Sequence, residues 1–145
     1  MKRTSLALIM FVLISVFSMP LAALAGECET RVFVNGKPVT SDVPATIVNG
    51  STMLPFRAIL NSLGVSNDQI IWRQESKCVQ VRNEGTFIFL AVGNNAALVN
   101  QTMVQLNTAP FIKNERVLVP VRFISQSLGA QVDWDEQNRI VNIQT

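Results

Sequence analysis

The sequence predicts an α+β domain of two similar halves, each a set of short antiparallel strands with one helix packed on the sheet. The first observation is that a strand-to-helix stretch occurs twice, at residues 51–64 and 116–129. The second is that turn signals such as Asn35-Gly36 interrupt short apolar runs, a pattern typical of antiparallel strands. The third is that apolar residues recur with helical spacing only once in each half.

A shift of 65 positions relates the two copies. It superposes residues of the same kind: Met53 on Leu118, Pro55 on Pro120, Arg57 on Arg122, Ile59 on Ile124 and Gly64 on Gly129. An internal repeat constrains the architecture before any local assignment is made. We therefore expect two repeats, at about residues 31–83 and 96–145, joined by a strand at 86–92.

Residues 1–25 have the pattern of a signal peptide. Lys2 and Arg3 precede an apolar run at residues 6–17, and residues 23–25 form an Ala-Leu-Ala cleavage signal. The apolar run is short for a membrane span, so we expect no span after cleavage. The domain would then comprise residues 26–145.

Charge excludes one class of partner. The chain has 12 basic and 10 acidic residues, and two of the basic residues lie in the leader. The mature domain is therefore close to neutral. It has no basic cluster, which argues against nucleic acid as a partner.

The expected strands are short and follow the same order in both repeats. In the first repeat they cover residues 31–34, 45–48, 52–54, 70–72 and 78–81. In the second they cover residues 97–99, 103–106, 110–112, 117–119, 132–134 and 139–143. The linking strand at 86–92 is apolar on both faces. Such a strand is either covered or exposed at an interface, so we expect a seam between the halves or a dimer contact here.

Each helix begins at a proline and ends at a glycine. Pro55 suits the first helical position because its φ is fixed and it lacks an N–H group. The apolar residues Phe56, Ile59, Leu60 and Leu63 then form one stripe. Gly64 is the expected left-handed cap. The second helix repeats this pattern from Pro120 to Gly129.

The residue types exclude most enzymatic chemistry. The chain contains no histidine and no tyrosine, and no glycine-rich phosphate loop. The usual general base and the commonest metal ligand are therefore missing. We expect no catalytic residue, no metal and no cofactor. Met53 and Met103 lie in apolar runs and are expected in the core.

Two arginines and two tryptophans are the candidate site residues. Arg57 and Arg122 each stand near the start of a helix, where the positive end of the helix dipole disfavours a cation. We favour a structural hub that hydrogen-bonds nearby carbonyls or an acid, with an anion contact as the alternative. Trp72 and Trp134 are expected as core aromatics.

The two cysteines allow a single intramolecular disulfide. Export would permit a bridge between Cys28 and Cys78, which closes a loop of about 50 residues. The alternative is two separate thiols, because a sequence does not show whether two Cβ atoms meet.

Three motifs carry a resemblance to a known family. They are Val-Asn-Gly-Lys-Pro-Val at residues 34–39, Leu-Val-Pro-Val-Arg-Phe-Ile at 118–124 and Leu-Gly-Ala-Gln-Val-Asp-Trp-Asp at 128–135. Together they resemble the copper amine oxidase-like N-terminal domain, or stalk domain, over nearly all of residues 31–145. Arg73, where the family usually has an acid, is a departure from the pattern.

The resemblance implies an appended, non-catalytic module. Such domains occur on exported, cell-surface proteins of Gram-positive-type bacteria. Copper chemistry in the oxidases requires histidine ligands and a tyrosine-derived quinone, and this chain has neither residue type. We therefore expect an interaction or structural module of the cell envelope that binds cell-wall polymer, an envelope protein or a second copy of itself. The alternatives are a secreted protein that binds a small anion or peptide, and a secreted inhibitor of a hydrolase.

Overall fold

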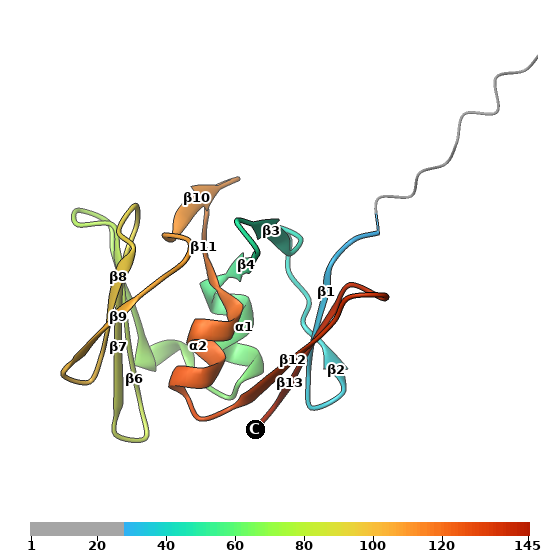
Figure 1. The fold of residues 1–145 in the computed structure, drawn as a ribbon. Helices are drawn as coiled ribbons and strands as arrows, with labels where there is room; N and C mark the ends of the chain where they lie inside the picture. Colours follow the sequence, from blue (N-terminus) through green and yellow to red (C-terminus); the bar gives the residue numbers. More distant parts are fainter. Residues whose placement is uncertain (1–27) are drawn as a thin grey trace, which may run out of the picture.

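The computed structural model describes residues 28–145, and the predicted signal peptide lies outside them. The chain folds into three β-sheets and two α-helices, which is compatible with the α+β class. The two helices lie side by side, with one sheet on each side and the third sheet above them in Figure 1. None of the helices in the described part is long and apolar enough to cross a membrane.

The first repeat region contributes the elements β1 (Arg31–Val34), β2 (Lys37–Pro38), β3 (Thr46–Val48), β4 (Ser51–Pro55), α1 (Phe56–Ser62), the short 3₁₀ helix η1 (Asn67–Gln69), β5 (Ile70–Arg73) and β6 (Cys78–Asn83). The linking strand is β7 (Thr86–Ala91). The second region contributes β8 (Ala96–Val99), β9 (Thr102–Gln105), β10 (Phe111–Lys113), β11 (Arg116–Pro120), α2 (Val121–Ser127), β12 (Gln131–Asp135) and β13 (Ile140–Gln144).

The central sheet has the strand order β10-β11-β4-β3 and mixes the two repeats. Its middle pair, β4 and β11, is antiparallel and centred on Leu54 opposite Val119. These two residues are themselves related by the 65-residue shift. Neither repeat has a sheet of its own here, because the strands that precede the two helices pair with each other. The expectation of two similar halves, each a set of short strands with one helix, is therefore not confirmed by the sheet topology.

Of the two outer sheets, one pairs consecutive strands and the other joins the two ends of the described chain. One has the order β5-β6-β7-β8-β9, and the other has the order β12-β13-β1-β2. In the second sheet, β1 pairs in parallel with β13, with Arg31 beside Ile140 and Val34 beside Ile143. The expectation of antiparallel strands alone was wrong at this pair. A parallel pairing between the two ends of a domain has no local turn that a sequence pattern could reveal.

The helices are shorter than the sequence predicted. Pro55 and Pro120 are the residues that cap the helix starts, and both still pair within the central sheet. The helical turns therefore begin one residue later. At the other end, Gly64 and Gly129 have φ angles of +86° and +84°, as a left-handed cap requires.

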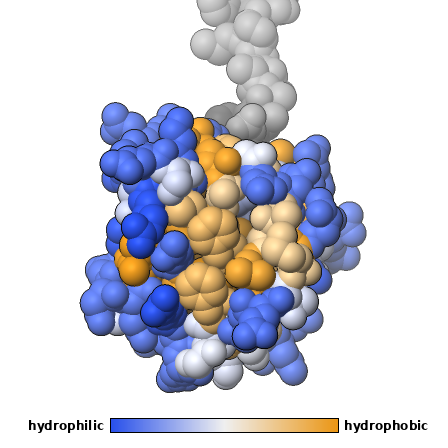
Figure 2. Space-filling view, turned by 90° about the vertical axis from the view of Figure 1, so that its left-hand side faces the viewer, coloured by the Kyte–Doolittle hydropathy of each residue, from blue (hydrophilic) through white to orange (hydrophobic). Residues whose placement is uncertain are grey.

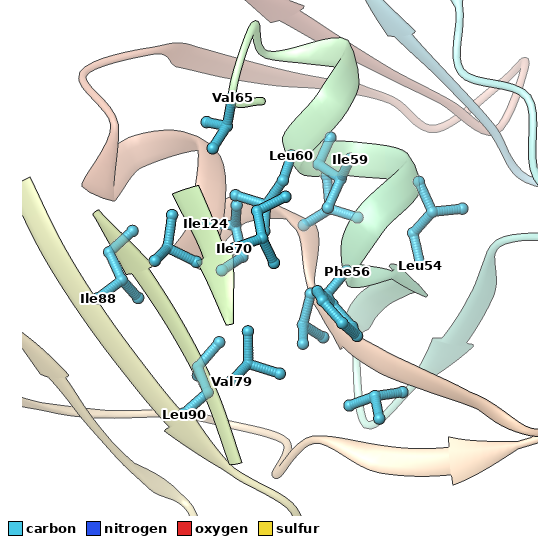
Figure 3. Packing of buried hydrophobic residues seen from close by; sticks show 14 of the residues in the cluster. Leu54, Phe56, Ile59, Leu60, Val65, Ile70, Val79, Ile88, Leu90 and Ile124 are labelled. Carbon is cyan, nitrogen blue, oxygen red and sulfur yellow. The ribbon is translucent and has the colours of Figure 1, made fainter. Parts of the chain in front are cut away.

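The core lies between the helices and the outer sheets. Figure 3 shows Ile59 and Leu60 of α1 and Ile124 of α2 directed toward the same interior as Ile88 and other side chains of the five-stranded sheet. These four side chains have no exposed surface. Because each helix has only seven residues and would be marginal alone, this burial is what stabilises it.

The predicted disulfide is not formed. Cys28 is exposed at the start of the described chain and Cys78 is buried in β6, and both thiols are free. The chain around Cys28 leads into β1, whereas β6 belongs to the sheet on the other side of the helices. Cys78 instead lies 3.1 Å from the Ser76 hydroxyl.

Candidate functional site

The outward side of the five-stranded sheet carries a row of mainly apolar residues that is exposed at its two ends. Consecutive pairings bring Ile71, Gln80, Phe89, Leu98 and Met103 into one line across all five strands. Met103 is 66% exposed and Ile71 is 41% exposed. The sequence placed Met103 in the core, and this was wrong: the alternation along β9 turns it to the outside.

We define the outer face as this row together with its charged and aromatic neighbours Arg73, Arg82 and Phe87. The guanidinium of Arg82 lies over the Phe87 ring, 5.6 Å from its centroid. The set contains two positive charges and no carboxylate. Figure 2 shows apolar atoms gathered at the centre of this side of the molecule, with hydrophilic residues around them. An apolar centre with a polar rim is typical of protein interfaces.

The linking strand is covered on one side only. In β7, Ile88 and Leu90 are buried against the helices, whereas Phe87 and Phe89 on the opposite side are partly exposed. The strand lies between β6 and β8 and so connects elements of both repeats. Its sequence indicated that both faces of the strand are apolar. The sequence did not show which face is exposed, because this depends on which face of the sheet the helices cover.

Two clefts flank the helix starts. The Arg57 cleft, of about 660 Å³, is lined by Arg57, Trp72, Asp42 and Arg116 among others. Three of its charged side chains are engaged within the protein, whereas the carboxylate of Glu115, which also lines the cleft, has no partner within residues 28–145. Arg116 and Asp42 form an ion pair at 2.7 Å. Arg57 donates a hydrogen bond of 3.4 Å to the side-chain oxygen of Asn67 and lies over the Phe56 ring.

The Arg122 cleft, of about 470 Å³, occupies the equivalent place in the second repeat. Arg122 and Trp134 stand where the first cleft has Arg57 and Trp72. At the positions of Arg116 and Asp42, this cleft has Ser51 and Asn107. Among the described residues, Arg122 is the only charged one that lines this cleft. Within residues 28–145, no side chain pairs with the guanidinium of Arg122.

Neither arginine forms the expected structural hub. Both are exposed at the mouths of clefts, and neither contacts an acid of the described chain. The positions that the sequence singled out are thus brought to equivalent surface sites, on opposite copies of one repeated unit. The sequence could not reveal the clefts, because each also takes residues from the other repeat.

The two tryptophans differ. Trp72 packs on the core near Phe56, with ring centroids 6.3 Å apart, and its indole N–H donates to Gln74 at 2.9 Å. Trp134 is 38% exposed and lines the Arg122 cleft. The prediction of a core aromatic was therefore wrong for Trp134. It lies in β12, at the edge of its sheet, where no further strand covers it.

Residues 28–145 contain no group of three or more His, Cys, Asp or Glu residues that could hold a metal ion. The pKa of Asp135 is lowered, chiefly because the side-chain amide of Asn138 donates to its carboxylate at 2.8 Å. That contact stabilises the turn between β12 and β13.

The structure describes a domain of three sheets and two short helices, with an apolar outer face and two clefts. The family model described as the copper amine oxidase N-terminal domain matches residues 33–143. The chain belongs to this family. The catalytic domain of the oxidases is not part of the match.

One relative gives a functional description. It is a protein named "Protease inhibitor" from Brevibacillus choshinensis, 27% identical over 105 residues. The alignment covers 72% of this chain and 31% of the relative, so the chain spans about a third of that protein's length.

Proposed function

We propose that the protein is a non-catalytic interaction module of the bacterial cell envelope, which binds a protein partner through the outer face. The observation that carries this proposal is the exposed apolar row from Ile71 to Met103. Contact of these apolar side chains with water is unfavourable. Removing apolar surface from water contributes about 25 cal/mol of favourable free energy per Å².

Charge indicates the chemistry of the partner. Arg73 and Arg82 border the row, and the outer face has no carboxylate of its own. The partner we propose therefore presents apolar side chains with carboxylates beside them, since complementary charge guides association and selects partners.

Size indicates the strength of the interaction. Five strands about 4.8 Å apart and about five residues long give a face of roughly 400 Å². This area includes the polar residues of the face, and it is below the roughly 800 Å² that each partner contributes to a standard interface. We infer a transient interaction, or one that also uses the polar rim.

The test compares two variants. A double variant, Ile71→Glu with Met103→Glu, adds charge at two exposed positions of the face. Ile112→Glu, at an exposed apolar residue of β10, is the control. A partner would be identified by cross-linking to the intact protein in envelope extract and then measured as a purified protein. We expect the double variant to bind it at least about tenfold more weakly and the control to bind it normally.

Equal binding by both variants would exclude the outer face as the binding surface. Sedimentation of the protein alone is the companion measurement. If the protein sediments as a dimer and the double variant does not, the outer face is a self-association surface instead.

Export is part of the proposal and rests on the pattern of residues 1–25. The exported protein is expected to begin at Gly26, and the mass of the protein recovered from a bacterial culture measures this. A full-length mass in the envelope fraction would instead indicate a retained leader.

A second candidate function is inhibition of a hydrolase, which the "Protease inhibitor" relative favours. The free thiols mean that no disulfide would brace such an inhibitor. The test is the residual activity of secreted bacterial proteases, titrated with the purified protein. A stoichiometric loss of protease activity supports inhibition. If every protease tested instead degrades the purified protein, the inhibitor function is excluded for those proteases.

We also propose that the chain arose from two copies of one unit. The 65-residue shift and the pairing centred on Leu54 and Val119 support this proposal.

A further inference from the structure

The two clefts are equivalent in position but differ in how their polar groups are engaged. In the Arg57 cleft, the tryptophan N–H donates to Gln74, Arg57 to Asn67, and Arg116 to Asp42. The cleft therefore satisfies much of its own hydrogen-bonding capacity.

The Arg122 cleft lacks these internal contacts. Ser51 and Asn107 replace the ion pair of the other cleft. Within residues 28–145, the side chains of Arg122, Gln126 and Trp134 make no hydrogen bond with one another or with a neighbour. The cleft thus combines one uncompensated positive charge, several free amide and hydroxyl groups, and an exposed indole.

The positions of these groups suit a single small ligand. Arg122 and Gln126 are four residues apart in α2, so their side chains lie on one face of the helix. Trp134 of β12 and the Ser51 region of β4 line the same cleft. A volume of about 470 Å³ lies within the range of sites that bind small molecules.

We propose that the Arg122 cleft binds an acidic saccharide unit. A guanidinium recognises a carboxylate through two parallel hydrogen bonds. The indole face can cover the apolar C–H face of a sugar ring, and the amide and hydroxyl side chains can bond its hydroxyl groups. A peptide carboxyl terminus fits less well, because such termini are usually held by clustered backbone N–H groups, whereas the donors here are side chains.

This inference concerns a different surface from the proposed protein interface and does not depend on it. The probe is glucuronic acid, with glucose, acetate and a short peptide with a free carboxyl terminus as comparison ligands. The reporter is the pair of indole N–H signals in an NMR spectrum, since the chain has two tryptophans, one in each cleft.

We expect glucuronic acid to shift the Trp134 indole signal and to leave the Trp72 signal in place. Arg122→Gln should weaken this binding about tenfold or more, because a hydrogen bond to a charged group is lost. Arg57→Gln, at the equivalent position of the other cleft, is the matched control and should bind normally. The midpoint of thermal unfolding checks that both variants are folded.

Three results would overturn the proposal. One is an equal response to glucose or to acetate, which would show that the carboxylate or the sugar ring is not recognised. Another is a response to the peptide but not to glucuronic acid. The third is unchanged binding by the folded Arg122→Gln variant. The apolar outer face is intact in all of these variants, so failure here would leave the protein-interface proposal untouched.

Discussion

Arg122 occupies a position that is slightly unfavourable for the stability of its helix. It lies in the first turn of α2, which has no acidic residue and no side-chain cap. A cation there interacts unfavourably with the helix dipole by a few tenths of a kcal/mol. No ion pair within the described chain offsets this cost. The position suggested a structural hub in the sequence, whereas the guanidinium has no hydrogen-bond or ion-pair partner within residues 28–145.

Ser125 provides a stability prediction. Its hydroxyl is buried in α2 and has no hydrogen-bond partner in the described chain. Ser125→Ala should raise the free energy of unfolding by about 1 kcal/mol, because it removes an unsatisfied polar group and places a better helix former there. Urea denaturation measures the change.

Ser127 is the matched control for this substitution. Its hydroxyl, two residues along the same helix, donates to the carbonyl of Phe123 at 2.7 Å. Ser127→Ala therefore should not stabilise to the same extent. Equal stabilisation by both variants would mean that helix propensity alone accounts for the effect.

Asp135 gives a prediction for pH. Hydrogen bonds from Asn138 lower its pKa in the folded state. A lowered carboxyl pKa stabilises the fold at neutral pH, and this stabilisation is lost as the pH falls through the lowered pKa. Asn138→Ala should therefore raise the pKa of Asp135 toward its ordinary value. An NMR titration of the Asp135 carboxyl would follow this, and an unchanged pKa would contradict the assigned cause.

At the scale of elements, the strand–proline–helix–glycine unit was readable from the sequence. The apolar stripe predicted the buried side of α1, and Gly64 and Gly129 predicted the two helix ends. The exact helix starts were not readable, because Pro55 and Pro120 also take part in sheet pairing. A local pattern does not show that a distant strand competes for the same residues.

Gly129→Ala tests the helix end. The N–H of Gly129 bonds to the carbonyl of Gln126, and that of Ala130 bonds to the carbonyl of Ser125, which completes the cap. A methyl group at Gly129 would meet no atom within 4 Å, so only backbone strain is added. We expect a loss of about 1 kcal/mol in the free energy of unfolding. Gly129→Asn should lose less, because asparagine tolerates this backbone conformation better.

At the scale of the whole molecule, the pairing of distant segments was beyond sequence reasoning. The similarity of the sequence to itself at a shift of 65 residues was visible, but the pairing of strands from the two similar stretches was not. Leu54 opposite Val119, and Arg31 beside Ile140, join residues that no turn signal connects. The clefts depend on such pairings, because each is lined by residues from both regions of the chain. The outer face instead lies on consecutive strands. The individual residues of the clefts and the outer face could be named from the sequence, while their shared location could not.

The shared sheets predict that neither repeat folds alone. A fragment of residues 28–92 would lack β11, the partner of β4, and β13, the partner of β1. We expect this fragment and its complement, residues 93–145, to be unfolded separately by circular dichroism and to recover structure when mixed. Cooperative thermal unfolding of either fragment on its own would contradict this interdependence.

The parallel pair β1–β13 has a mechanical consequence. Tension applied between the start of β1 and the end of β13 would slide the two strands past each other along their length. Their hydrogen bonds would then be loaded together in shear, rather than opened one after another. The N–H of Asn35 bonds to the carbonyl of Ile143 at 2.8 Å, and the Asn35 side chain bonds Thr145 through both its amide nitrogen and its oxygen. These contacts add hydrogen bonds at the end of the pair, so they would share the load if the two strands were pulled apart in this direction.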